Sequence, residues 1–200
     1  MLKKLEEEAQ EEIDVEYDKK NITGNGKEID INDEKVKDRW SRYIGAMGID
    51  AVSKQSKADI LVFGLGPMAL EVIKNLVLSG CRRLTIVDEK DVRFEDLSGG
   101  FFYSEADIGK KRLESILYKI RELNIYVKID TLPLKDVTEE IIKTYHLVFV
   151  TEMSFKDQFT LNEQCRTHNV KFISAEFRGA HCRVFNDFGD KFEVLDKNGE

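Results

Sequence analysis

The segment Ala58–Asp88 constrains the fold of this chain more than any other part of it. It contains an apolar strand at residues 59–63, a glycine turn at residues 64–69, a helix with one apolar face, and a second strand at residues 83–87. A unit of this kind, with G-x-G-x-x-A at the first turn and an acid about 20 residues further on, is typical of a nucleotide-binding half-sheet. The segment therefore predicts a parallel βαβ unit.

The glycine turn is an imperfect nucleotide site. Gly64 and Gly66 would let backbone N–H groups and a helix N-terminus approach a phosphate, and Asp88 would bind ribose hydroxyls. Pro67 removes one N–H donor and stiffens the turn, although proline also suits the first position of a helix. Asp88 could equally cap the turn that follows its strand. The turn predicts the fold more strongly than it predicts phosphate binding.

Strand and helix patterns alternate along the rest of the chain. This alternation predicts an α/β fold, a Rossmann-like, doubly wound and mostly parallel sheet with helices on both faces and antiparallel strands at the C-terminal end. Apolar residues at helical spacing indicate helices at residues 33–53, 67–80, 113–123, 138–144 and 156–168. The expected strands lie at residues 59–63, 83–87, 126–131, 146–151, 171–177 and 181–187, with an edge hairpin at 191–195.

Charge and apolar content divide the chain into two parts. The net charge is -7, and residues 1–36 account for -6 of it with twelve acids and six lysines. Residues 1–33 are expected to form an acidic, mobile arm with at most a short helix at 2–12, and residues 34–200 to form the folded domain. The near-neutral folded part argues against a nucleic-acid partner. No apolar run reaches the roughly 18 residues needed to span a bilayer, and no leader opens the sequence, so a soluble intracellular protein is expected.

Several conspicuous residue types are expected to be structural. The cysteines are odd in number and lack metal-ligand spacing, which favours reduced packing residues at Cys81, Cys165 and Cys182. No metal site is expected in this domain. Isolated histidines are expected at the surface or at strand ends: His146, His168 and His181. Asp187-Phe188-Gly189 matches the magnesium-binding motif of protein kinases. The Gly-rich strand pair, catalytic loop and strand lysine of kinases do not accompany it, so the segment is expected to form a turn. Phe101, Phe102 and Tyr103 are expected in the core or in an interface.

Five short segments, taken in order, resemble the ubiquitin-activating enzyme family, and specifically its N-terminal, catalytically silent adenylation half of the ThiF type. The likeness covers roughly residues 37–200, and no single motif decides it alone. The matching segments are Asp38–Gly45, Gly64–Asn75, Asp96–Ser98, Glu105–Arg112 and Glu122–Asn124. A tail at Phe188–Asp190 and Asp196–Glu200 is similar to the ubiquitin member in particular, where a catalytic-cysteine half-domain would follow.

The resemblance implies a large ligase-type enzyme of the cytoplasm and nucleus. Such an enzyme uses ATP and Mg²⁺ to adenylate ubiquitin, captures it as a thioester, and passes it to a ubiquitin-conjugating enzyme. Two adenylation folds pair as an intramolecular pseudodimer, and the second carries the chemistry. Here Gly99 stands where the active half has an arginine, Arg112 where it has a lysine, and Glu152 near its magnesium-binding aspartate. The resemblance therefore implies no catalytic residue in this half, a vestigial nucleotide site at Gly64, Gly66, Asp88 and Arg112, and no cofactor in this fragment.

The resemblance also implies a role for an arginine near the start of the domain. In the family, the silent half extends an arginine across the pseudodimer to the ATP phosphates of the opposite site. That position is Arg39 here, with Arg42 one helical turn later. The family's usual flanking tyrosine and glutamine are Lys37 and Trp40, and Asp38, Arg39 and Arg42 could equally form a solvated helix face.

Three alternatives stay open. A small subunit of a SUMO- or NEDD8-activating enzyme shares the same half, and the sequence that follows Glu200 would separate it from the ubiquitin reading. An NAD-dependent dehydrogenase domain is supported by Gly64, Gly66 and Asp88 alone, and it lacks a substrate domain and a base. A bacterial sulfur-carrier adenylyltransferase would need the missing arginine and zinc-binding C-x-x-C pairs.

Overall fold

The computed structural model describes residues 34–193, without the side chains of residues 35 and 36. The expected acidic arm at 1–33, its short helix and the tail at 194–200 lie outside the described residues. Asp33, expected to cap the first helix, lies outside them as well.

A six-stranded sheet forms the centre of the domain, in the order β3-β2-β1-β4-β5-β6. The first five of these strands run parallel, and β6 pairs antiparallel with β5, as the sequence predicted. The strands β1 and β4 lie side by side although β2 and β3 come between them in sequence, so the chain reverses its direction of winding there. The strands are β1 (Asp59–Phe63), β2 (Arg83–Val87), β3 (Lys128–Thr131), β4 (Leu147–Val150), β5 (Lys171–Arg178) and β6 (His181–Asp187).

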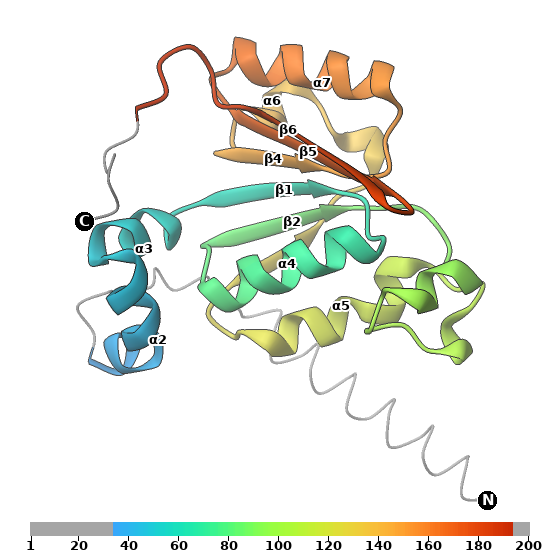
Figure 1. The fold of residues 1–200 in the computed structure, drawn as a ribbon, viewed down its shortest axis with the longest axis horizontal. Coiled ribbons are helices and arrows are strands. Elements are labelled where there is room, and N and C mark those ends of the chain that lie inside the picture. Colours follow the sequence, from blue (N-terminus) through green and yellow to red (C-terminus); the bar gives the residue numbers. More distant parts are fainter. Residues whose placement is uncertain (1–33, 194–200) are drawn as a thin grey trace, which may run out of the picture.

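Helices cover both faces of the sheet. Figure 1 shows α4 and α5 on one face, α6 and α7 on the other, and α2 with α3 at one end. Two buried apolar clusters follow this arrangement, one between the sheet and α4–α5, and one under α6–α7. The helices are α2 (Glu34–Met47), α3 (Ile49–Gln55), α4 (Pro67–Ser79), α5 (Arg112–Leu123), α6 (Glu139–Ile142) and α7 (Phe155–Thr167), with 3-10 turns η1 (Phe94–Ser98), η2 (Glu105–Asp107) and η3 (Leu134–Asp136).

The ends of α4 follow directly from three residues. Gly66 is extended at the N-cap and its carbonyl accepts the Leu70 N–H at 3.0 Å, while Pro67 occupies the first helical position. Gly80 ends the helix with φ 86°, a left-handed conformation that glycine adopts without strain. The βαβ unit inferred from the sequence is therefore confirmed in its strands, turn and helix.

Helices α2 and α3 pack at the end of the sheet where the parallel strands begin. Trp40 is 6% exposed and its Nε1 donates to the carbonyl of Leu78, at the last turn of α4, at 3.3 Å. The Trp40 ring also meets Tyr126, just before β3, with centroids 5.8 Å apart. This contact fixes α2 on the domain at the edge opposite to the glycine turn.

Several boundaries differ from the sequence expectation. The single helix expected at 33–53 is two helices, because Gly48 adopts φ 82° between them. The expected edge hairpin at 191–195 is wrong for residues 191–193, which form no strand, and residues 194–195 lie outside the described part. The remaining ends shift by one or two residues, as helix and strand ends commonly do.

The residues expected to be structural are mostly so. Cys81 and Cys165 are buried, whereas Cys182 is exposed on β6 and is no packing residue. His146 and His181 are exposed and His168 half-buried, and the Asp187–Gly189 turn ends β6 with the Gly189 N–H donating to Asp187. Among the described residues, no helix is both long and apolar enough to cross a membrane, and no group of His, Cys, Asp and Glu side chains suits a metal ion.

Candidate functional site

The glycine turn lies at the carboxyl ends of β1, β2 and β4, where the winding of the sheet reverses. Ligands of open α/β sheets bind at this kind of edge. Gly64 has φ 92° and its N–H donates to the carbonyl of Val87 at 3.0 Å, which joins the turn to the end of β2. The Thr151 N–H donates to the Phe63 carbonyl at 2.9 Å, which joins the end of β4 to the end of β1.

Arg112, at the start of α5, holds three carboxylates together beneath the turn. Its guanidinium is 3.1 Å through Nε and 2.5 Å through Nη2 from the carboxylate oxygens of Asp96. Nη1 donates to Glu152 at 2.8 Å and lies 3.5 Å from Asp88. The side chains of Arg112, Asp88 and Asp96 are 4%, 1% and 6% exposed. Such a buried cluster is satisfied internally, and its Asp88 carboxylate is not offered to solvent.

The protonation equilibria reflect this burial. Burial raises the pKa of Asp88 above its ordinary value. The Lys90 N–H, which donates to Asp88 at 2.9 Å, and the nearby Arg112 charge lower this pKa, but burial outweighs them. Burial lowers the pKa of Arg112, but its hydrogen bonds to Asp96 and Glu152 outweigh this and raise it. The contact with Lys90 makes Asp88 the cap of the turn after β2, which was one of the two readings of this residue.

Asp88→Asn should change the pH dependence of stability. Folded Asp88 holds its proton more tightly than the unfolded chain does, so its ionisation lowers the free energy of unfolding as pH rises above about 4. Asparagine keeps the oxygen that accepts from Lys90 and cannot ionise. Urea denaturation should show the variant gaining stability relative to the unmodified chain between pH 4 and pH 7. A difference that stays flat or falls over this range would contradict the assignment.

Gly99 and Pro67 pack against each other beside the glycine turn. A Cβ atom placed on Gly99 would lie 2.9 Å from Cβ of Pro67, closer than real Cβ contacts allow. An arginine at position 99 would therefore have to displace the proline ring of the turn.

Cavities lie on both sides of Glu152. One, of about 380 Å³, extends over Gly66, Pro67 and Met68 to the end of β5. The other, of about 460 Å³, extends over Phe63, Gly64, Val87, Asp88 and Lys90, the side on which the sequence predicts ribose binding. Thr151, Glu152, Met153 and Ser154 line both.

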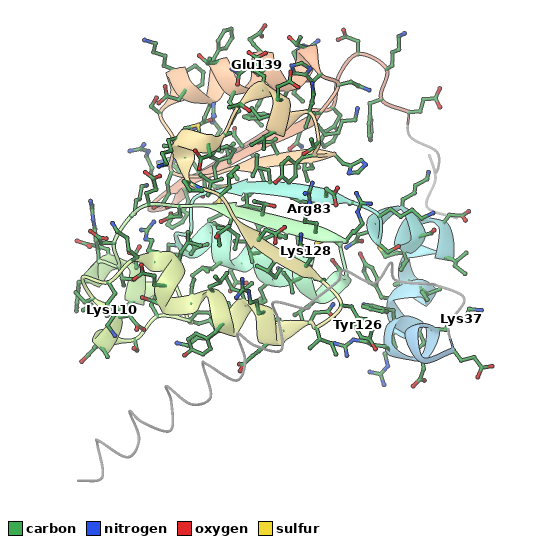
Figure 2. All side chains as sticks on the ribbon, turned by 180° about the vertical axis from the view of Figure 1, so that it is seen from behind. Lys37, Arg83, Lys110, Tyr126, Lys128 and Glu139 are labelled. Carbon is green, nitrogen blue, oxygen red and sulfur yellow. The ribbon has the colours of Figure 1, made fainter. Side chains whose placement is uncertain are left out.

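Arg39 lies at the opposite end of the domain from this cleft. It is exposed on α2, and its guanidinium carbon is 5.6 Å from the Trp40 ring centroid and 5.5 Å from that of Tyr126. Figure 2 shows Tyr126 and Lys37 at one end of the domain and Lys110, in the segment before α5, at the other. Arg42 is also exposed on α2. The structure thus brings Gly64, Gly66, Asp88 and Arg112 together and keeps Arg39 and Arg42 apart from them.

Sequence reasoning missed two residues that shape the cleft. Asp96 belongs to the matching segment Asp96–Ser98, but the sequence assigned it no role. Its carboxylate accepts hydrogen bonds from the Arg93 N–H and from Arg112 Nε. Tyr103 donates its hydroxyl to the carbonyl of Leu65, inside the glycine turn, at 2.8 Å, and burial raises its pKa. Asp96 and Arg112 are opposite charges at neighbouring motifs, which was the one available signal.

Of the aromatic run, Tyr103 is core, Phe102 is half-buried and Phe101 is 56% exposed.

The chain belongs to the ThiF family, whose sequence pattern matches residues 40–192. It is 39% identical over 168 residues to the human protein named ubiquitin-like modifier-activating enzyme 6, and 35% identical over 161 residues to Candida albicans ubiquitin-activating enzyme E1 1. Each alignment covers 80% of this chain and 16% of the relative. The resemblance to ubiquitin-activating enzymes is therefore confirmed, and the chain spans about a sixth of the length of these relatives.

Solved structures show the same fold. E. coli MccB with succinimide superposes with a TM-score of 0.60 at 19% identity, covering 70% of this chain and 45% of that one. E. coli MccB with MccA-N7isoASN gives 0.61 at 20% identity. The Rossmann-like class, its mostly parallel sheet and its antiparallel C-terminal strands are confirmed.

Proposed function

We propose that this chain is the N-terminal, noncatalytic adenylation half of a ubiquitin-activating enzyme. In the full-length protein, ATP and Mg²⁺ would bind in the other adenylation half, where ubiquitin is adenylated before it passes to a cysteine thioester and a ubiquitin-conjugating enzyme. The observation that carries the proposal is the filled cleft: Arg112, which replaces the lysine of active halves, is bound to three carboxylates of its own chain. Arg112, so engaged, is not available to stabilise a transferring phosphoryl group.

Arg39 would supply an arginine in trans, with Arg42 beside it on α2. An exposed guanidinium between two aromatic rings is held in place by cation–π attraction and keeps its planar donors available. Because Arg39 is at the far end of the domain from the Asp88–Arg112 cleft, it cannot reach that cleft, whereas a partner surface could present a site to it. This arrangement supports a role toward a second adenylation fold.

The partner of this half would be the active adenylation half of the same enzyme. The exposed Phe101 ring lies against the half-buried Phe102 ring with centroids 4.1 Å apart, an apolar feature that a pseudodimer would cover. The cytoplasm and nucleus are the proposed location of the enzyme.

Thioester formation tests the proposed function. The full-length protein should form an ATP-dependent, thiol-sensitive conjugate with ubiquitin, whereas the 200-residue chain should form none and should show only background ATP–pyrophosphate exchange. Charging of SUMO or NEDD8 in place of ubiquitin would instead support the small-subunit alternative. Exchange activity in the 200-residue chain alone would overturn the assignment as a noncatalytic half.

A further inference from the structure

Glu152 occupies an unusual position for a side chain in an α/β cleft. It is the second residue after β4 and has φ 55°, the left-handed region that residues other than glycine seldom adopt. This backbone turns its side chain back over the carboxyl ends of the strands, where Arg112 Nη1 donates to it at 2.8 Å. Lys90 Nζ lies 3.7 Å from the same carboxylate and 3.4 Å from the Glu152 carbonyl oxygen.

The carboxylate of Glu152 lies in contact with the glycine turn. A Cβ atom placed on Gly66 would be 2.8 Å from the carboxyl carbon of Glu152 and 2.9 Å from each of its oxygens. A Cβ atom on Gly64 would be 3.4 Å from the nearer oxygen. Glycines of such a turn normally leave this space for phosphate oxygens. Here a carboxylate of the chain itself fills it.

Glu152 also stands between the two cavities of the cleft. It lines the cavity above Pro67 and Met68 and the cavity beside Asp88 and Lys90. Gly66, Pro67 and Met68 line only the first of these cavities, and Gly64, Asp88 and Lys90 line only the second. A ligand that spans both, as a nucleotide does, would need the position that the Glu152 side chain holds.

We propose that Glu152 is an internal ligand that keeps this cleft closed to phosphate-bearing molecules. Its carboxylate neutralises the outer nitrogen of Arg112 and the ammonium of Lys90, and it excludes a second anion by charge and by volume. The site is thus blocked by one side chain, in addition to its loss of catalytic groups. This goes beyond the proposed function, because it concerns anion binding by this domain and holds whichever modifier the full-length enzyme activates.

Removal of the carboxylate should open the cleft. In Glu152→Gly, the left-handed backbone suits glycine, while Arg112 and Lys90 lose their shared anion. ADP titrated into the 200-residue chain, with inorganic pyrophosphate as a second probe, should bind the variant with a dissociation constant at least about 10-fold below that of the unmodified chain. This corresponds to about 1.4 kcal/mol, the scale of one charge-assisted hydrogen bond.

Two further variants distinguish the effect of the Glu152 charge from the effects of its side-chain volume and of the net charge of the chain. Glu152→Gln keeps the size of the side chain and removes its charge, so it should give a smaller gain and serves as the measurement if the glycine variant does not fold. Glu163→Gln, on the exposed side of α7, changes the net charge by the same amount and should give no gain. Tighter binding in Glu152→Gly than in Glu163→Gln supports the proposal. Equal affinity of Glu152→Gly and the unmodified chain, or micromolar binding by the unmodified chain, would overturn it and leave the ubiquitin thioester test unaffected.

Discussion

Arg112→Met should lower the free energy of unfolding by about 3–5 kcal/mol, the usual cost of leaving buried carboxylates without their cation. Arg112 is 3% exposed, and its guanidinium is the shared partner of Asp88, Asp96 and Glu152. Methionine keeps most of the length of the side chain, so the loss would come from unpaired charge more than from a cavity. Urea denaturation at pH 7 measures it.

Arg166→Met is the matched control for this prediction. Arg166 also contacts two carboxylates, those of Asp187 and Asp190, but its side chain is 39% exposed. Water can replace these contacts, so the loss should be distinctly smaller than for Arg112→Met. Losses of equal size in the two variants would show that the buried charge cluster does not organise the cleft.

Most of the fold could be predicted from the sequence because local signals and the sheet pattern agree. The strands at 59–63 and 83–87 are mostly apolar, and Pro67 and Gly80 mark both ends of the helix between them. The break at Gly48 was missed, because the apolar spacing continues through it and hides the change of direction. The segment 191–195, expected to form an edge hairpin, is short, and a short strand pattern is a weak signal where no second strand fixes the register.

The site was harder to predict than the fold. Glycine spacing indicated the turn, and the position of Asp88 after its strand placed it at the same edge. That Asp88 and Asp96 share one arginine depends on where the segment 90–111 brings the start of α5, and no local pattern encodes that. The contact of Glu152 with Gly66 depends on a left-handed residue after β4, which sequence propensities would not assign to glutamate.

Arg39→Ala should slow adenylate formation by the full-length enzyme about 10- to 150-fold, since charge-assisted hydrogen bonds of this kind contribute about 1.5–3 kcal/mol. Arg39→Lys should recover part of the rate, because an ammonium cannot reproduce the planar fork of donors. Asp88→Ala in this half should change stability more than catalysis. The loss of the Trp40 and Tyr126 contacts should cost little, about 0.5–1 kcal/mol at an exposed site, so the fold should persist.

Lys37→Ala is the matched control for Arg39→Ala. Lys37 is an exposed cation on the same helix, and it projects from the same end of the domain in Figure 2. Its removal changes the net charge equally and should leave adenylate formation near the unmodified rate. A similar loss in both variants would indicate a general electrostatic effect of α2 in place of a specific contact.

ATP–pyrophosphate exchange, measured with ubiquitin on the full-length enzyme, tests the assignment of this chain most directly. Arg39→Ala should reduce the exchange rate by at least about tenfold while its thermal unfolding remains close to that of the unmodified enzyme. Exchange by Arg39→Ala that is indistinguishable from the unmodified enzyme would contradict the assignment and return Arg39 to a solvated helix face.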